Sequence, residues 1–63
     1  MTGRYMITVW NDHGVETASL RDTLDEARTR AHELHAEAGG RRLVTVWDSG
    51  NHMNVLTLEK KNV

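Results

Sequence analysis

The sequence predicts an α+β domain of ββαββ order, in which a four-stranded antiparallel sheet carries one helix on one face. Three observations lead to this prediction. The run I-T-V-W-N-D at residues 7–12 returns thirty-seven positions later as V-T-V-W-D-S at residues 44–49. Each copy alternates β-branched residues with Thr and Trp and leads into a polar turn that contains Gly, which is typical of the first arm of a β-hairpin. One helical pattern lies between the copies.

The first predicted hairpin covers residues 4–20. Its strands span residues 4–10 and 15–20, and neither face of the first strand is polar. The turn at residues 11–14 contains Asn11 and Asp12, whose side chains can close Asx-type hydrogen bonds, and Gly14, which can adopt a positive φ. We therefore expect a tight connection between the two strands.

The predicted helix begins after Thr23, which forms a T-x-x-E capping box with Glu26. Gly39 and Gly40 end it, and Gly39 suits the left-handed position after the last helical turn. Apolar residues recur at three- and four-residue steps and form one narrow stripe, namely Leu24, Ala27, Ala31, Leu34 and Ala38. Because most of them are Ala, the helix can lie close to the sheet.

The second predicted hairpin has strands at residues 41–47 and roughly 52–59, joined by a turn at residues 48–51. Because strands two and three flank the helix, we expect them to run parallel, with a right-handed crossover that leaves room for strand one between them. The predicted strand order is 2-1-3-4, with antiparallel neighbours throughout. The order 2-1-4-3 stays open as the alternative.

One helix can cover only one face of such a sheet. Strict alternation assigns to the helix side Ile7, Val9, Ala18, Leu20, Val44, Val46, Leu56 and Leu58. It assigns to the other side Met6, Thr8, Trp10, Val15, Thr17, Leu43, Thr45, Trp47, Met53, Val55 and Thr57. A water-facing side of an antiparallel sheet is normally polar, whereas this one is mostly apolar. Such a patch usually marks a contact surface.

The short chain supports the same interpretation. A domain of 63 residues has a marginal core, and the absence of Cys excludes disulfides as support. If the second face buries about 600 to 800 Å² per chain, it makes an ordinary specific interface. We expect a face-to-face homodimer, with the interface formed by Met6, Thr8, Trp10, Val15, Leu43, Thr45, Trp47, Met53 and Val55. The alternative is that the threonines tolerate water and the face stays open.

Composition limits the classes of function. The net charge of −1 gives no general attraction to phosphate backbones, and no apolar run reaches a membrane span. We expect a single cytoplasmic domain over residues 1–63, without a cofactor. No nucleophile motif or phosphate loop is present, so we expect no enzymatic activity. His32 and His35 lie three apart on the helix, but without a third ligand nearby they make a weak metal pair, and we predict no metal site.

A second function class remains open. Trp on central strands with cations near the rim is an arrangement by which sheets stack unpaired bases. The residues in question are Arg4, Trp10, Arg41, Arg42 and Trp47. The alternative function is therefore a small single-stranded nucleic-acid-binding protein that uses the same sheet face. The neutral charge balance argues against it.

The stretch T-L-D-E-A at residues 23–27, the Gly pair and the strand L-V-T-V-W-D-S-G at residues 43–50 together resemble short uncharacterised proteins common in actinobacteria and their phages. The likeness covers residues 23–50. It carries no activity onto particular residues. It implies a phage or mobile-element accessory protein, many of which bind a host protein, so we expect a host protein partner beside the homodimer.

Overall fold

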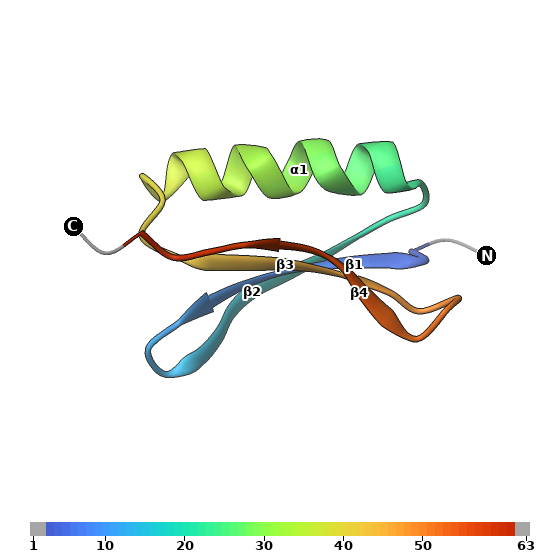
Figure 1. The fold of residues 1–63 in the computed structure, drawn as a ribbon, viewed down its shortest axis with the longest axis horizontal. Coiled ribbons are helices and arrows are strands. Elements are labelled where there is room, and N and C mark those ends of the chain that lie inside the picture. The colour runs from blue at the N-terminus through green and yellow to red at the C-terminus, as the bar shows by residue number, and fades with distance from the viewer. Residues whose placement is uncertain (1–2, 62–63) are drawn as a thin grey trace.

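The chain folds into one helix lying on one face of a four-stranded sheet (Figure 1), and the computed structural model describes residues 3–61. The elements are β1 (Tyr5–Asn11), β2 (Gly14–Arg21), α1 (Leu24–Glu37), β3 (Leu43–Asp48) and β4 (Met53–Leu58). The strand order is β2-β1-β3-β4, and every neighbouring pair is antiparallel. This confirms the predicted α+β fold and its strand order, and the order 2-1-4-3 is not adopted.

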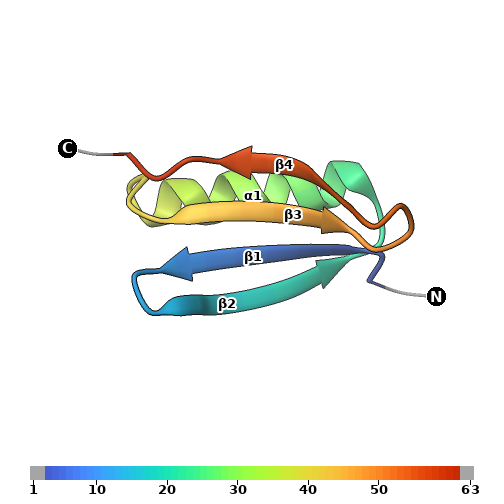
Figure 2. The same ribbon diagram turned by 60° about the horizontal axis from the view of Figure 1, so that its bottom comes forward.

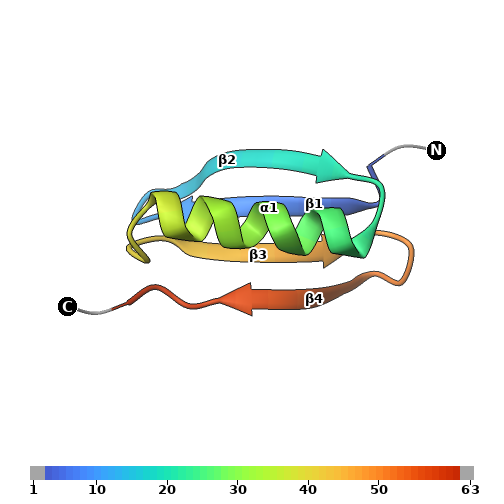
Figure 3. The ribbon, with the colours of Figure 1, turned by 90° about the horizontal axis from the view of Figure 1, so that it is seen from above.

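The helix lies above the two central strands, with β2 and β4 on either side of it (Figure 3). Two of its alanines, Ala27 and Ala31, are fully buried, because a methyl side chain lets the helix approach the sheet closely. Leu24 remains exposed at the start of the predicted stripe. The buried core consists of Tyr5, Ile7, Val9, Ala27, Ala31, Val44 and Val46. It is therefore a thin layer confined to the space between α1, β1 and β3.

Both ends of the helix follow the prediction. The Glu26 amide donates to the Thr23 hydroxyl oxygen at 3.2 Å, and that hydroxyl donates to the Glu26 carboxylate at 2.9 Å. At the other end, Gly39 and Gly40 have φ of 65° and 74°. Their amides donate to the carbonyls of Ala36 and His35, both at 2.9 Å, which is the Schellman arrangement. The chain turns into β3 from there.

The two inner strands pair regularly, and the two outer strands do not. Thr8 lies directly opposite Thr45, so the repeated Thr-Val-Trp runs meet side by side and antiparallel at the middle of the sheet. The register of β2 shifts opposite Val9 and Trp10, which leaves Glu16 as an extra residue. The register of β4 shifts in the same way and leaves Val55 unpaired. Each β-bulge reverses the faces of the residues on one side of it.

Candidate interaction surface

Figure 2 shows the sheet from the face that points away from α1, and the strand register places side chains on this face in three rows that run across the strands. We call this surface the open face. Residues opposite each other on antiparallel strands share a face. The register therefore gives a first row of Leu20, Met6, Trp47 and Asn54, a middle row of Ala18, Thr8, Thr45 and Thr57, and a third row of Val15, Trp10 and Leu43. None of these side chains carries a formal charge.

The predicted faces of β2 were wrong beyond its bulge. Ala18 and Leu20, expected on the helix side, pair with Thr8 and Met6 and so belong to the open face. Thr17, expected on the open face, pairs with the core residue Val9 and lies on the helix side. The extra residue at Glu16 causes the exchange, because it breaks the alternation that the prediction assumed. As a result, β2 adds Ala18 and Leu20 to the apolar surface.

The same error affects two predicted interface residues on β4. Val55 is the bulged residue, and it packs against the core instead of lying on the open face. Met53 pairs with Asp48, whose other neighbour is the core residue Tyr5, so Met53 belongs to the helix side. Asn54 takes the place on the open face opposite Trp47. The open face is therefore apolar over β2, β1 and β3 and polar over β4.

The indole of Trp10 lies across the middle of the open face. Its Nε1–H donates to the Thr45 hydroxyl oxygen at 3.0 Å, so the ring reaches from β1 towards the neighbouring strand β3. Thr8 is only 3% exposed, although no second layer from residues 3–61 lies on this face. Side chains of the face itself must therefore cover it, and the Trp10 ring binds Thr45, the residue directly opposite Thr8. The ring is thus held against the sheet, and the residue Trp10 remains 37% exposed.

Several polar groups of the open face already have partners within the chain. Besides the bond between Trp10 and Thr45, the Asn54 amide donates to the Thr57 hydroxyl at 2.7 Å and to the Leu56 carbonyl at 3.3 Å. The apolar side chains, by contrast, remain exposed, most of all Val15 at 57% and Leu20 at 56%. Such a surface loses little hydrogen bonding when water leaves it, because each of these bonds lies within the chain.

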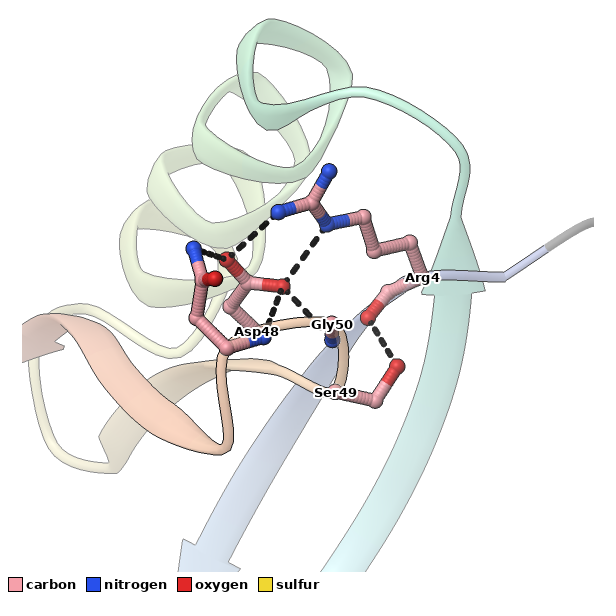
Figure 4. Close-up of polar contacts among 5 residues, drawn as sticks. Arg4, Asp48, Ser49 and Gly50 are labelled. Atoms are coloured by element: carbon pink, nitrogen blue, oxygen red, sulfur yellow. Dashed lines mark hydrogen bonds and ion pairs between the residues drawn. The ribbon is translucent and has the colours of Figure 1, made fainter.

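A separate polar cluster, which the sequence did not predict, joins Arg4 to the turn after β3 (Figure 4). The Asp48 carboxylate is buried, with 4% of its side chain exposed, and it accepts two hydrogen bonds from the Arg4 guanidinium. It also accepts the Gly50 amide at 2.9 Å and the Asn51 side-chain amide at 3.1 Å. The hydrogen bond from Arg4 lowers the pKa of Asp48, and the Gly50 amide adds to this against the opposing effect of burial. The cluster holds the turn in place and is structural in character.

Of the five residues proposed to bind nucleic acid, three lie close together in the structure. Trp10, Arg41 and Arg42 line one hollow of about 240 Å³ beside the turn between β1 and β2. Arg42 forms an ion pair with Glu16 at 3.4 Å. Trp47 stands in the first row of the open face, at the other end of β1 from Trp10. Arg4 also lies at that end, where it is bound to Asp48.

The histidines of the helix do not assemble a metal centre. His32 is exposed, while His35 turns its Nε2 towards the Glu59 carbonyl oxygen at 2.9 Å. Within residues 3–61, no group of three or more His, Asp or Glu side chains is placed to bind a metal ion. In the same part of the chain, no helix combines the length and the apolar character that crossing a membrane requires.

No family model, curated protein or solved structure matches this chain. The functional argument therefore depends on the chemistry of its surfaces. Among these, the open face is the one on which the register aligns uncharged side chains from all four strands.

Proposed function

We propose that this protein is a small non-enzymatic interaction module that homodimerises through the open face and presents its helix and loops to a protein partner. The observation that supports the proposal most directly is the orientation of β2. This strand turns Val15, Ala18 and Leu20 away from α1. Its polar residues Thr17 and Ser19 lie on the helix side, opposite the core residues Val9 and Ile7.

That orientation is unfavourable for an isolated chain. In an antiparallel sheet with one covered face, the apolar side chains normally point towards the cover. A shift of one residue in the pairing would turn the apolar set of β2 to the other face, yet the adopted register leaves Val15 and Leu20 more than half exposed. Burial of these side chains against a second surface removes the free-energy cost of exposing them to water.

The small core also favours dimerisation through the open face. The largest fully buried side chains are Ile7, Val44 and Val46, and the helix contributes only two fully buried alanines. Full burial of one aliphatic side chain contributes about 1.5–3 kcal/mol, which is little for a chain of 63 residues. Burial of the open face against a second copy supplies the missing apolar contact, and both tryptophans lie within it.

The wider role follows from the sequence resemblance. Short actinobacterial and phage proteins of this layout support a phage or mobile-element accessory protein that binds a host protein. With the open face occupied by the second copy, the exposed side of α1 remains for that partner. It is rich in charged side chains, including Asp25, Arg28 and Glu33.

Sedimentation equilibrium at micromolar concentration tests the dimer. The proposal expects about twice the monomer mass of 7.2 kDa. Trp47→Arg places a charge in the first row and should dissociate the dimer. Val15→Arg should do the same with less risk to the fold, because Val15 lies on an outer strand and is 57% exposed. His32→Arg adds the same charge on the exposed side of the helix and should leave the mass unchanged.

A monomeric wild-type protein contradicts the proposal. So does an unchanged dimer in both Arg variants of the open face, provided that circular dichroism shows each variant to be folded. Loss of the dimer in His32→Arg as well would place the contact on the helix and would equally overturn the proposal.

The second candidate function is binding of single-stranded nucleic acid. It is favoured by one observation, the position of Trp10 beside Arg41 and Arg42 in one hollow. A base stacked on an aromatic ring contributes about 1–3 kcal/mol. A monomer whose Trp fluorescence is quenched by an oligonucleotide, and less so as salt rises, would support this function. Absence of quenching at low salt would exclude it.

A further inference from the structure

We infer that the two copies pair about a two-fold axis that runs across the strands, along the middle row of the open face, so that β2 lies over β2 of the second copy. This inference rests on the proposed function. The axis lies between the two sheets and passes over Ala18, Thr8, Thr45 and Thr57. Each of these residues then meets its own counterpart.

The uneven character of the open face favours this axis. The face is apolar over β2, where it carries Val15, Ala18 and Leu20, and polar over β4, where it carries Asn54 and Thr57. An axis parallel to the strands would lay β2 of one copy over β4 of the other. Leu20 would then face Asn54, and Ala18 would face Thr57. An axis across the strands lays β2 over β2 and avoids both mismatches.

The order of the rows fits the same axis. Two rows that are apolar over β2, β1 and β3 flank a middle row that is mostly Thr. Rotation about that middle row places the first row of one copy over the third row of the other. Leu20 then lies over Val15, Met6 over Trp10, and Trp47 over Leu43. Each indole meets aliphatic or thioether atoms, and threonines meet threonines. None of the side chains that the register assigns to the three rows carries a charge.

The area of the open face and the hydrogen bonds within it also suit a dimer interface. Four strands spaced about 4.8 Å apart, over about six residues of 3.4 Å each, cover roughly 400 Å² in projection. The accessible area of side chains on that footprint is larger and approaches the about 600–800 Å² per partner of an ordinary interface. The Trp10 N–H is already bound to Thr45, and the Asn54 amide to Thr57. The pairing therefore buries few polar atoms without partners.

Single cysteines test the axis, because the natural sequence contains none. Ala18→Cys and Thr57→Cys lie on opposite outer strands, yet both should cross-link to themselves through a short bismaleimide, since packed sheets lie about 10 Å apart. With an axis parallel to the strands, each would lie about 17 Å from its counterpart. Ser19→Cys, the neighbour of Ala18 on the opposite face, is the matched control.

At micromolar protein, Ala18→Cys and Thr57→Cys should each give at least about tenfold more cross-linked dimer than Ser19→Cys, because the thiols within a dimer experience an effective concentration near millimolar. A sedimenting dimer that cross-links only when Ala18→Cys and Thr57→Cys chains are mixed overturns the axis and leaves the proposed function standing. Equal cross-linking of all three variants also overturns the axis. A monomer in sedimentation overturns both.

Discussion

Arg4 and Asp48 lie forty-four positions apart in the sequence and form a two-pronged ion pair, with Nε to Oδ1 at 2.8 Å and Nη2 to Oδ2 at 3.2 Å. The pair connects the residue before β1 to the last residue of β3. Ser49 reinforces the connection, because its amide and its hydroxyl both donate to the Arg4 carbonyl, at 3.0 and 2.7 Å. The two central strands, β1 and β3, are thereby joined at one end by side-chain hydrogen bonds as well as by their backbone pairing.

The ion pair predicts a specific loss of stability in acid. The pKa of Asp48 lies below its ordinary value of 3.8 because Arg4 donates to the carboxylate. Its stabilising contribution is therefore fully present above about pH 4 and disappears as the pH falls through the lowered pKa of the folded state. Asp48→Asn should lower the melting temperature at pH 7 by about 5 °C or more. Thermal unfolding at pH 7 and at pH 2 measures the change.

The difference between wild type and Asp48→Asn should shrink as the pH falls through the lowered pKa of Asp48, because the wild-type carboxylate then loses its charge as well. Asp12→Asn is the control, because Asp12 lies in the equivalent turn of the first hairpin and its side chain is 84% exposed, with an ion pair to Lys60. It should change the melting temperature little at either pH. A gap that persists undiminished in acid would contradict the role given to the carboxylate charge.

Removal of the helix cap should weaken the fold measurably. Thr23→Ala deletes the hydroxyl that accepts the Glu26 amide, and loss of such a cap costs about 0.5–2 kcal/mol. The expected decrease in melting temperature is about 4–8 °C for each kcal/mol in a domain of this size. Urea unfolding followed by circular dichroism measures the cost. Thr23→Ser retains the hydroxyl and should restore most of the stability; equal losses in both variants would argue against the cap.

The end of the helix predicts a difference between two substitutions of one glycine. Gly39 has φ of 65°, and a Cβ built there meets no other described atom within 4 Å. Gly39→Ala should therefore lose about 1–2 kcal/mol from backbone strain alone. Gly39→Asn should lose less, because Asn tolerates the left-handed conformation. Chemical denaturation of both variants decides the matter, and an Asn variant no better than the Ala variant would contradict the assignment.

Dimerisation through the open face predicts that stability depends on protein concentration. If folding and association are coupled, each tenfold dilution should lower the melting temperature by about 5 °C. Trp fluorescence follows the transition over three decades of concentration. Val15→Arg should melt at a temperature that does not change with concentration. A wild-type melting temperature that is equally constant would speak against coupled association.

The order of the elements was predictable because each signal was local. The capping box of Thr23 and Glu26, the Gly pair after the helix and the two polar turns all follow from the preferences of a few neighbouring residues. The crossover of the helix also favoured the strand order 2-1-3-4 that the structure adopts, although it left the order 2-1-4-3 open. These predictions needed no knowledge of how one strand aligns with the next.

The faces of the outer strands were not predictable in the same way. Alternation along a strand holds only while each residue has one partner, and the bulges at Glu16 and Val55 interrupt it. Neither position has the Gly that often marks a bulge. The Arg4 to Asp48 pair was missed for a related reason, because it requires the exact alignment of β1 with β3 and leaves no trace in local sequence.

The two bulges bear on how large an assembly of this chain can become. They lie on β2 and β4, the edge strands of the sheet. The unpaired N–H and C=O groups of a regular edge strand can form hydrogen bonds with a further strand. Interrupted margins hinder lateral growth into ribbons. The proposed pairing through the open face uses the same patch on both chains and is therefore complete with two copies. The fold thus favours a closed, finite particle over a filament.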